Sequence, residues 1–412
     1  MHIIYIHQHF CTNQGSSGTR SLDVSRHMVR LGHKVTMICG LLDVSGLKPM
    51  PWYRLFRREK LEGIHLIVCN VPYTNHMGAM KRIGAFLWFA FLATIAAVFM
   101  TRRPDLVFAT STPLTVGIPG YLTGRLRRIP FIFEVRDIWP EAFVISGELK
   151  PGLMVNVAQR LEEFLYNRAE RILLVSPGFE ERLVERGFLR GKMKTILLGA
   201  DGDLFRDAQP DPEFRRRYGL EGKTLSIFTG AHGPSNGLDY VMAAAEHLKD
   251  RGDIAFVFLG EGREKPRLKE LAREKGLTNT LFLDAVPKTA LPGILTSCDI
   301  GLMILLHVGR PRPVTPNKIF DYMFAGLPSV VNFPGCTWEM VERDGAGVGS
   351  DPLDPGDLAR RVAHWADHPD ERKRIGAHSR DVAYAKYSRD AIAEQLLGAF
   401  GDVLAARRRR GA

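Results

Sequence analysis

The chain has 412 residues, of which 45% are hydrophobic and 25% charged, a globular composition that excludes a mainly disordered chain. One hydrophobic core stops growing near roughly 250 to 300 residues, so the length predicts at least two domains. The formal net charge of +11 indicates an anionic partner. The five cysteines are scattered without a Cys-x-x-Cys pair, which argues against a disulfide framework or a structural zinc site and favours a reducing compartment.

Apolar runs typical of buried strands alternate with helical patterns, and this alternation occurs twice. In the first half the runs are HIIYIHQHF, KVTMIC, LVFAT, PFIFEV and RILLVS. After about residue 205 the pattern starts again with LSIFTG, IAFVFLG, LFLDAV, IGLMIL and SVVNF. Such alternation is typical of a parallel sheet with helices on both faces. We therefore predict an α/β protein of two doubly wound, Rossmann-like domains, at residues 1–205 and 206–385.

The two ends of the chain fit this division. The N-terminus, MHIIYIHQHF, is typical of a first strand and lacks the charged start and cleavage site of a signal peptide. The last helical pattern, residues 386–406, has apolar residues at helical spacing and is expected to pack back on the first domain. Doubly wound domains bind ligands at the carboxyl ends of their strands, so we expect the site in a cleft that the two domains share.

Residues 83–100 form an uncharged run of 18 residues, which is long enough to span a membrane. Spanning would put strands of one sheet on opposite sides of the bilayer, so we reject it. A buried helix and a helix lying in the membrane interface both remain open. Between residues 44 and 130 there are 12 Lys or Arg against 3 Asp or Glu. This excess favours contact with an anionic membrane surface through residues 51–60 and 83–103, with a merely basic surface as the alternative.

The stretch TPNKIFDYMFAGLPSVV, residues 315–331, predicts a helix from about 316 to 325 whose start can bind an anion. Lys318 adds a full positive charge to the free N–H groups of the first turn, where Asn317 also lies. Asp321 follows on the same face and is well placed to accept hydrogen bonds from a ribose. The set indicates a nucleotide-diphosphate cradle, and a capped helix with a solvated Lys–Asp pair is the alternative.

Two glycine-rich loops follow predicted strands. In FTGAHGPSNGLD, residues 228–239, Gly233 permits close approach of the backbone to a phosphate, and His232 is a candidate contact for phosphate or sugar. A glycine-rich turn without a ligand is the alternative. In the first domain, NQGSSGTR places Gly15 and Ser16 where they could approach a diphosphate.

The run EVRD ends the predicted strand PFIFEV at its carboxyl end, which is the expected cleft side. Arg136 is a candidate to bind a donor or acceptor phosphate, and Asp137 is a candidate to orient the acceptor hydroxyl. Glu134 stands beside them and completes the predicted acceptor group. A structural Arg–Asp pair is the alternative.

Taken together, EVRDIWPE, GLD after a glycine-rich turn, GEGREKPRLKELA and PNKIFDYMFAGLPSV resemble the motifs of the retaining glycosyltransferases of family 4. Within that family the chain is most similar to the branch that builds O-antigen, capsule and exopolysaccharide, including N-acetyl-L-fucosamine transferase-like proteins. The resemblance covers nearly the whole chain and implies the GT-B architecture, two Rossmann-like domains facing across a cleft. It also implies a nucleotide sugar in the C-terminal domain and an acceptor, often polyprenyl-diphosphate-linked, in the N-terminal domain.

The resemblance implies roles for further residues. Lys265 matches a basic position that neutralises the donor diphosphate, with Arg263 in that role or a plain surface lysine as the alternatives. Val286 lies in a loop whose backbone contacts the nucleobase. Asp321 matches the second of two glutamates in the family's usual signature, which holds the ribose hydroxyls. The first of the two falls at Pro313, so that acid is absent. Its contact with the donor sugar is therefore expected from elsewhere, such as the backbone of residues 314–317.

The predicted catalytic residues are Lys265 and Lys318, which stabilise the departing diphosphate, together with Arg136 and Asp137. The resemblance implies attack on the same face of the sugar, with retention. The Asp-x-Asp of ADGD, residues 200–203, is expected to be a linker turn. No metal or other cofactor is expected, because the cations and the helix dipole supply the charge.

The expected function is transfer of a sugar, of the N-acetylated hexosamine type, from a UDP-sugar to a polyprenyl-diphosphate-linked glycan in bacterial surface polysaccharide synthesis. The expected location is the cytoplasmic face of the inner membrane, peripheral or monotopic. The alternatives are a UDP-sugar epimerase and a non-catalytic protein that binds nucleic acid or anionic lipid. The excess positive charge lies beside an apolar helix rather than along a groove, which fits lipid better than nucleic acid.

Overall fold

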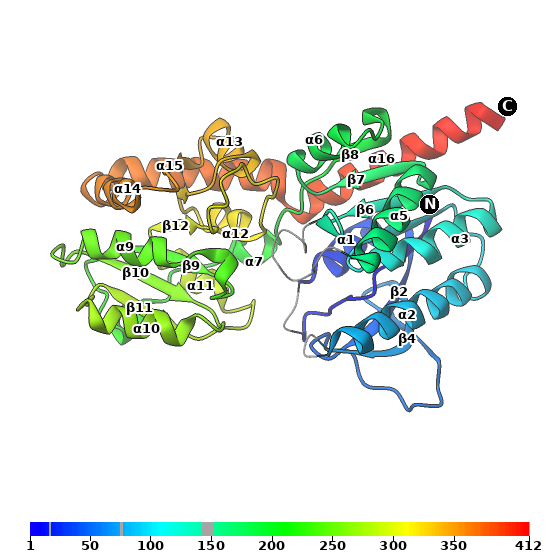
Figure 1. The fold of residues 1–412 in the computed structure, drawn as a ribbon, viewed down its shortest axis with the longest axis horizontal. Coiled ribbons are helices and arrows are strands. Elements are labelled where there is room, and N and C mark those ends of the chain that lie inside the picture. The colour runs from blue at the N-terminus through cyan, green and yellow to red at the C-terminus, as the bar shows by residue number, and fades with distance from the viewer. Residues whose placement is uncertain (16–17, 75–76, 142–151, 412) are drawn as a thin grey trace. The chain divides into compact units, whose positions relative to one another are not determined.

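The computed structural model describes most of the chain, namely residues 1–15, 18–74, 77–141 and 152–411. It contains two compact units, both of α/β type (Figure 1). Unit 1 comprises Met1–Leu197 with Arg389–Ala412, and unit 2 comprises Leu198–Ser388. The fold class predicted from the alternation of apolar runs is confirmed.

The first boundary between the units lies before the predicted one at residue 205. Residues 198–205 belong to unit 2. The reason is that Phe205 is buried in that unit and stacks on Phe324, with ring centroids 5.9 Å apart. The apolar pattern alone does not reveal this contact, because the two phenylalanines are far apart in the sequence.

Unit 1 contains an eight-stranded sheet in the order β3-β4-β2-β1-β5-β6-β7-β8. All neighbouring strands are parallel except β3, which pairs with β4 in the antiparallel sense. The central strand β1 is buried along its whole length, as expected for a parallel sheet covered on both faces. The strands are β1 His2–Ile6, β2 Lys34–Leu42, β3 Phe56–Leu61, β4 Ile64–Tyr73, β5 Leu106–Thr110, β6 Phe131–Val135, β7 Arg171–Leu174 and β8 Met193–Thr195.

Helices cover both faces of this sheet (Figure 1). α1 and α16 share one hydrophobic core with the central strands, and the crossover helices α2, α3, α5 and α6 lie on the other face. The helices are α1 Arg20–Arg30, α2 Ala79–Phe99, α3 Gly117–Arg127, α5 Leu153–Arg168, α6 Pro177–Glu185 and α16 Arg389–Gly411, with short 3-10 turns at Leu114–Val116 and Arg190–Lys192.

The C-terminal helix α16 packs on unit 1, as expected for the last helical pattern of the chain. Phe400 of α16 lies with its ring centroid 5.1 Å from that of Phe108 on β5. The helix begins at Arg389 rather than at residue 386. The residues before it belong to unit 2, where the carbonyl of Tyr387 accepts a hydrogen bond from the N–H of Ala200 at 3.0 Å.

The hairpin of β3 and β4 is absent from the sequence prediction. Strand β3, FRREKL, carries a charge at most positions and therefore resembles a basic surface segment. Glu62 and Gly63 connect it to β4 with φ angles of 48° and 85°. Positive φ at both central residues is typical of a two-residue hairpin turn, so the turn fixes the antiparallel pairing.

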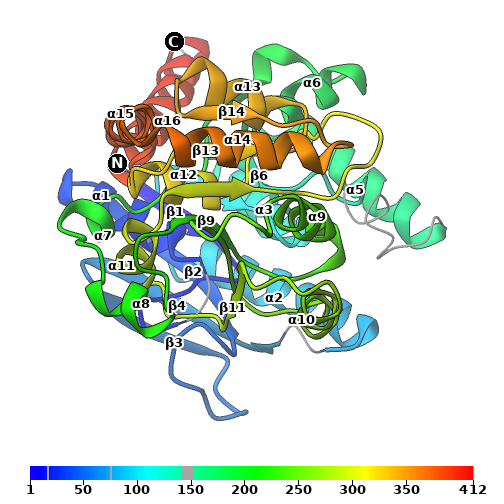
Figure 2. The same cartoon turned by 90° about the vertical axis from the view of Figure 1, so that its left-hand side faces the viewer.

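Unit 2 contains a six-stranded, all-parallel sheet in the order β11-β10-β9-β12-β13-β14. Its strands are β9 Thr224–Thr229, β10 Ile254–Leu259, β11 Thr280–Leu283, β12 Ile300–Met303, β13 Ser329–Val331 and β14 Gly347–Gly349. Helices α9, α10 and α14 share a core on one face (Figure 2), and α11, α12 and α13 cross over on the other.

The helical segments of unit 2 have the following bounds: α7 Asp203–Arg206, α8 Pro212–Arg217, α9 Asp239–His247, α10 Lys265–Glu274, α11 Leu291–Thr296, α12 Lys318–Phe324, α13 Cys336–Arg343, α14 Pro355–Asp367 and α15 Pro369–Val382, with a 3-10 turn at Pro234–Asn236 and a π-helical turn at Ala383–Tyr387.

α12 ends at Phe324 with Ala325 as its C-cap, close to the predicted end at residue 325. Gly326 has φ of 72°, its N–H donates to the carbonyl of Met323, and the N–H of Leu327 donates to the carbonyl of Tyr322. These two bonds form a Schellman motif, which requires the left-handed conformation that glycine adopts freely. The helix starts at Lys318, two residues later than predicted, with Asn317 as its N-cap.

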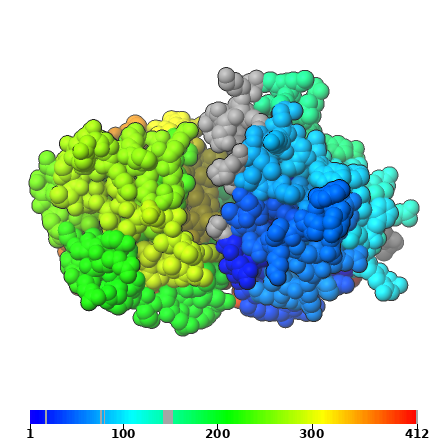
Figure 3. Space-filling view, turned by 90° about the horizontal axis from the view of Figure 1, so that it is seen from below, coloured from blue at the N-terminus to red at the C-terminus, as the bar shows by residue number. Residues whose placement is uncertain are grey.

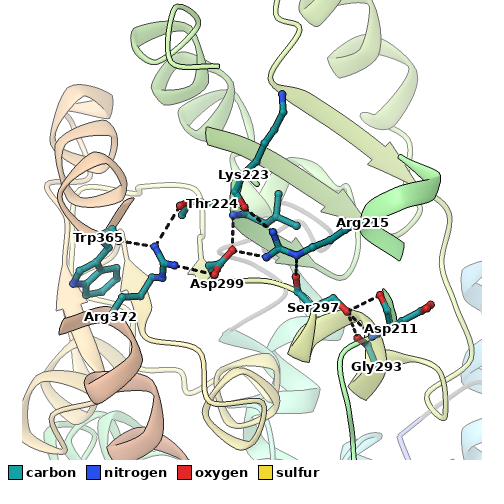
Figure 4. Close-up of polar contacts among 10 residues, drawn as sticks. Asp211, Arg215, Lys223, Thr224, Gly293, Ser297, Asp299, Trp365 and Arg372 are labelled. Carbon is teal, nitrogen blue, oxygen red and sulfur yellow. Dashed lines mark hydrogen bonds and ion pairs between the residues drawn. The ribbon is translucent and has the colours of Figure 1, made fainter. Parts of the chain in front are cut away.

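One aspartate connects four elements at the amino end of the unit 2 sheet (Figure 4). Asp299, just before β12, accepts hydrogen bonds from Arg215 of α8 at 2.7 Å and from Arg372 of α15 at 3.1 Å. It also accepts one from the N–H of Leu225 on β9 at 2.9 Å. Two guanidinium groups thus share one largely buried carboxylate.

We expect Asp299→Ala to lower the free energy of unfolding of unit 2 by about 3 kcal/mol, because both arginines lose their carboxylate while they stay largely buried. Urea unfolding of the whole chain measures this. Asp253→Ala is the control, since Asp253 forms an exposed pair with Arg251 and its removal is expected to cost less than about 1 kcal/mol. Equal losses in the two variants would contradict the role given to Asp299.

Candidate functional site

The loops that follow β9, β10, β11 and β12 meet at the carboxyl edge of the unit 2 sheet, because parallel strands end at the same side. The structure places every predicted donor-site residue of this unit in those loops or at the helix starts after them. His232 and Gly233 follow β9, Lys265 follows β10, Val286 follows β11, and Asn317, Lys318 and Asp321 follow β12.

Lys318 is a cation without a carboxylate partner in the described parts of the chain. Its Nζ lies over the ring of Phe228, 3.8 Å from the centroid. A Cβ at Gly230 would stand 3.4 Å from the same nitrogen, so glycine leaves room for the ammonium. Burial lowers the pKa of Lys318 to about 7. A ligand anion here would supply the charge that the protein does not.

Tyr322, on the same helix, fixes the position of Lys318. Its hydroxyl accepts a hydrogen bond from the N–H of Thr229 at 2.9 Å and lies 3.3 Å from the carbonyl of Leu302. These contacts bind α12 to the ends of β9 and β12. Asp321 lies one residue before Tyr322, in the first turn and partly buried, and its predicted contact with a ribose stays a prediction.

Asn317 and Gly233 leave open surface at the same edge. Asn317 is exposed, and its carbonyl accepts a hydrogen bond from the N–H of Phe320 at 3.0 Å. No atom lies within 4 Å of where a Cβ of Gly233 would stand. Val286 is partly exposed in the loop after β11. The predicted ligand contacts of these three residues fit their positions and stay predictions.

The predicted contact of the His232 side chain with phosphate or sugar is wrong for this structure. The ring is fully buried and lies between 6.1 and 6.4 Å from the rings of Phe228, Phe258 and Phe282. Burial, and then Lys265, lower the pKa of His232 to about 4, so the imidazole is neutral. The ring therefore belongs to an aromatic core behind the loop.

Lys265 is paired within the protein in this structure, and its predicted role toward the donor diphosphate stays a prediction. Its Nζ donates to the carboxylates of Glu261 at 2.8 Å and Asp284 at 2.6 Å, and to the carbonyls of Gly260 and Leu283 at 3.0 Å. An ammonium has only three N–H donors, so these acceptors use all of them. Lys265 thereby joins the loops after β10 and β11.

In unit 1, Glu134 ends β6 but does not face an acceptor. It is completely buried, and its carboxylate pairs with Arg20 at 2.8 Å and with Arg136 at 3.2 Å, while Thr110 also donates to it. Burial alone would raise the pKa of Glu134, but the two arginines outweigh it and hold this pKa below its usual value. The predicted acceptor contact is wrong, because these partners enclose the carboxylate.

Three further residues that sequence reasoning missed hold Arg136 in place. Ser21 Oγ accepts a hydrogen bond from Arg136 at 3.2 Å, and it lies 2.8 Å from His7 Nδ1 and 3.2 Å from Tyr5 Oη. Burial, and then Arg136, lower the pKa of His7 well below its ordinary value. Tyr5 lies on β1 and His7 directly after it, two residues further on, and this spacing at the strand end is the signal that could have found them. The Arg136 side chain keeps 20% of its surface exposed and can reach a ligand.

Asp137 is held by Thr112, whose hydroxyl donates to it at 3.3 Å, and burial raises the pKa of Asp137. The carboxylate that pairs with Arg136 is that of Glu134, so the alternative of a structural Arg136–Asp137 pair is not what the structure shows. Asp137 is partly exposed and can accept a hydrogen bond from a ligand hydroxyl.

Gly15 has a packing role rather than the predicted approach to a diphosphate. A Cβ at this position would stand 2.3 Å from the carbonyl oxygen of Val44, and its N–H already donates to the carbonyl of Thr12 at 3.0 Å. Close packing against residue 44 therefore explains the glycine. Ser16 lies outside the described residues.

Within the described ranges, no group of three or more His, Cys, Asp or Glu side chains is arranged to hold a metal ion. The second aspartate of ADGD, Asp203, begins α7 and pairs with Arg206 at 3.1 Å.

Two family models match the chain, and together they cover most of it. The model described as a glycosyl transferase 4-like domain matches residues 15–199. The model described as glycosyl transferases group 1 matches residues 210–382. The two matches correspond closely to units 1 and 2 of the structure.

Relatives and solved structures agree with these models. The chain is 23% identical over 323 residues to the probable glycosyltransferase WbjE of Pseudomonas aeruginosa, covering 77% of this chain and 79% of that protein. It is 23% identical over 291 residues to the putative colanic acid biosynthesis glycosyl transferase WcaI of Escherichia coli, covering 68% and 70%. The crystal structure of Anabaena HepE with UDP and glucose is similar in fold, with a TM-score of 0.68, 17% identity and coverage of 98% and 100%.

We expect Glu134→Gln to lower the free energy of unfolding of unit 1 by about 3 kcal/mol at neutral pH, because Arg20 and Arg136 keep their charges without a carboxylate. The folded-state pKa of Glu134 is lowered from 4.5, so its contribution is present above that pH and is lost as the pH falls. Acidification should therefore destabilise the wild type more than the variant. Urea unfolding at several pH values measures both effects.

The control is Glu163→Gln, which changes an exposed glutamate of α5 and should leave the stability unchanged. A Glu134→Gln variant as stable as the wild type at neutral pH would show that the two arginines do not depend on this carboxylate.

Proposed function

The chain belongs to the GT-B glycosyltransferase family, and on that premise we propose that it transfers a sugar from a UDP-sugar to a polyprenyl-diphosphate-linked glycan, with retention. The proposed sugar is of the N-acetylated hexosamine type, and the proposed pathway is bacterial surface polysaccharide synthesis. The relative named for colanic acid biosynthesis supports this pathway, and the HepE structure with UDP supports the donor nucleotide. The epimerase and non-catalytic alternatives find no support in the matched models.

The observation that carries the proposal is the cation of Lys318 at the carboxyl edge of the unit 2 sheet. Breaking the bond between a sugar and UDP develops negative charge on the departing diphosphate. In the proposed reaction Lys318 stabilises that charge, together with the positive end of the α12 dipole. Asp321 holds the ribose hydroxyls, and the reaction uses these groups without a metal ion or another cofactor.

The proposed acceptor site lies in unit 1, at the end of β6. Arg136 is fixed by Glu134 and Ser21 but keeps an exposed edge, which suits a phosphate of the lipid carrier. Asp137 can orient the attacking hydroxyl by accepting its hydrogen bond. Burial raises the pKa of Asp137, which makes its carboxylate a better proton acceptor for that hydroxyl.

Membrane contact through α2 is part of the proposal. By length and composition, α2 is the one helix of the described chain that could span a membrane. One side of it packs into unit 1, where Phe89, Leu92, Ala93 and Ala96 are fully buried, which supports a helix that lies on the membrane rather than across it. The other side exposes Leu87, Trp88 and Phe91, with about half of each side chain in solvent.

The segment 51–60 contacts the C-terminal end of α2. Arg58 of β3 donates a hydrogen bond to the carbonyl of Met100 at 3.4 Å. Trp52 and Tyr53, in the loop before β3, are largely exposed. The blue-coloured part of unit 1 in Figure 3 contains this segment. We place this surface on the cytoplasmic face of the inner membrane, with residues 51–60 and 83–103 against anionic lipid.

Transfer of radiolabel from UDP-sugars to extracted polyprenyl-linked acceptors tests the function directly. The proposal expects a labelled lipid-linked product that keeps the anomeric configuration of the donor. Transfer that proceeds only from a GDP-sugar would contradict the assigned nucleotide, and a product of inverted configuration would contradict retention.

We expect Lys318→Met to weaken UDP binding by about 10- to 100-fold, since a charged hydrogen bond is worth roughly 1.5 to 3 kcal/mol. Methionine keeps a chain of similar length over Phe228, so the fold should remain intact. Asp321→Ala should weaken UDP binding by about tenfold. Isothermal titration calorimetry measures both, with Lys373→Met, an exposed lysine of α15, as the control. Unchanged affinity for UDP in both variants would contradict the proposed nucleotide-diphosphate site.

We expect the triple substitution Leu87→Gln, Trp88→Gln and Phe91→Gln to reduce binding to vesicles that contain anionic lipid by about tenfold or more, because each side chain contributes roughly 1 kcal/mol or more when buried in the interface. Vesicle co-sedimentation measures this. The control is Leu353→Gln, which removes an exposed leucine of unit 2. If the triple variant sediments like the wild type, α2 does not contact the membrane.

A further inference from the structure

The loop between β12 and α12 is basic and has no acidic residue. We call residues 305–315, LLHVGRPRPVT, the arginine loop. It contains Arg310 and Arg312, and no Asp or Glu occurs within it. The loop leaves the carboxyl end of β12, so it lies at the same edge of unit 2 as Lys318.

Backbone contacts hold the arginine loop between the glycine-rich loop and the start of α13. The N–H of Leu306 donates to the carbonyl of Ser235 at 2.9 Å, and Arg312 Nη2 donates to the carbonyl of Leu306 at 2.8 Å. The N–H of Arg312 donates to the carbonyl of Pro334 at 2.8 Å, directly before Gly335 and α13. Arg312 is therefore held on both sides and has a defined position.

The charges of both arginines lack a counterion. Neither Arg310 nor Arg312 forms an ion pair with a carboxylate in the part of the chain that the structure describes. Arg312 is partly buried, and its Nε is shielded from solvent without a hydrogen-bond partner among the described residues. Burial, and then the charge of Arg310, lower the pKa of Arg312. Two neighbouring cations of this kind form a site for an anion.

The order of strands places the arginine loop away from the proposed position of the donor diphosphate at Lys318. The sheet runs β11-β10-β9-β12-β13, with Val286 after β11, the Lys318 ammonium at the end of β9, and Arg312 bonded to the residues after β13. Neighbouring strands are about 4.8 Å apart, so β13 lies about 10 Å from β9 along the edge. If Val286 marks the nucleobase and Lys318 the diphosphate, the transferred sugar lies toward the arginine loop.

We propose that the transferred sugar carries a carboxylate, which Arg312 and Arg310 bind. The inference rests on the proposed function, because it takes the donor nucleotide to lie at Lys318. A guanidinium group can hold a carboxylate through two parallel hydrogen bonds. A hexuronic acid has such a group in place of the 6-hydroxymethyl of a neutral hexose, and an N-acetylhexosaminuronic acid also keeps the N-acetyl group.

Donor pairs that differ only at carbon 6 test the proposal. Titration calorimetry compares UDP-glucose with UDP-glucuronic acid, and UDP-N-acetylglucosamine with UDP-N-acetylglucosaminuronic acid, with UDP itself as the reference. The acidic member of at least one pair should bind about tenfold more tightly than the neutral one. Arg310→Ala and Arg312→Gln should each remove most of that preference while leaving the affinity for UDP unchanged.

The matched control is Arg217→Ala, an exposed arginine at the end of α8, on the amino side of the sheet, which should keep the preference. A wild type without preference in either pair would overturn the proposal. Equal weakening of UDP and of all four donors in both variants would also overturn it, because the arginines would then bind the diphosphate. Absence of UDP binding by the wild type would contradict the proposed function itself.

Discussion

The site depends on where one lysine side chain is held. The Nζ of Lys318 lies beside an aromatic ring, and no carboxylate of the described chain pairs with it. Lys318 Nζ lies 3.8 Å from the centroid of Phe228, and burial lowers its pKa. Removing a charge from water is unfavourable, and this cost is what lowers the pKa. Tyr322 holds α12 against the ends of β9 and β12, and the Schellman motif at Gly326 ends the helix. Because the pKa of Lys318 is about 7, its side chain is only partly charged near neutral pH, and a ligand anion would favour the charged form.

In unit 1, by contrast, the arginines at the candidate site pair with a carboxylate. Arg20 and Arg136 share the buried carboxylate of Glu134, so one of their two positive charges is compensated within the protein. Arg136 nevertheless keeps an exposed edge, and Ser21 fixes its direction. Arg136 is therefore suited to binding an acceptor group through directed hydrogen bonds. Lys318 is suited to stabilising the negative charge that develops on the departing diphosphate. The two units thus differ in chemistry as well as in sequence.

Much of the fold could be predicted from the sequence, because buried parallel strands appear as apolar runs and Gly326 marks a helix end. The hairpin of β3 was missed, because its charged residues hide the strand pattern. In the site, the helix that carries Lys318 was predicted to within two residues of its start, but a motif does not reveal which way a side chain turns. Lys265 and His232 both turn inward, which their motifs do not indicate. Arg20 was missed, because its partner Glu134 is 114 residues away in the chain.

Proton uptake on UDP binding tests the central claim most directly. The pKa of Lys318 in the free protein is about 7, and a bound diphosphate should raise it by favouring the charged form. Titration calorimetry in buffers of different ionisation enthalpy should show uptake of close to one proton at about pH 8 and much less at about pH 6. Lys318→Met should abolish the difference. Equal proton uptake by the wild type and by Lys318→Met at the higher pH would contradict the assignment of the buried lysine to the diphosphate.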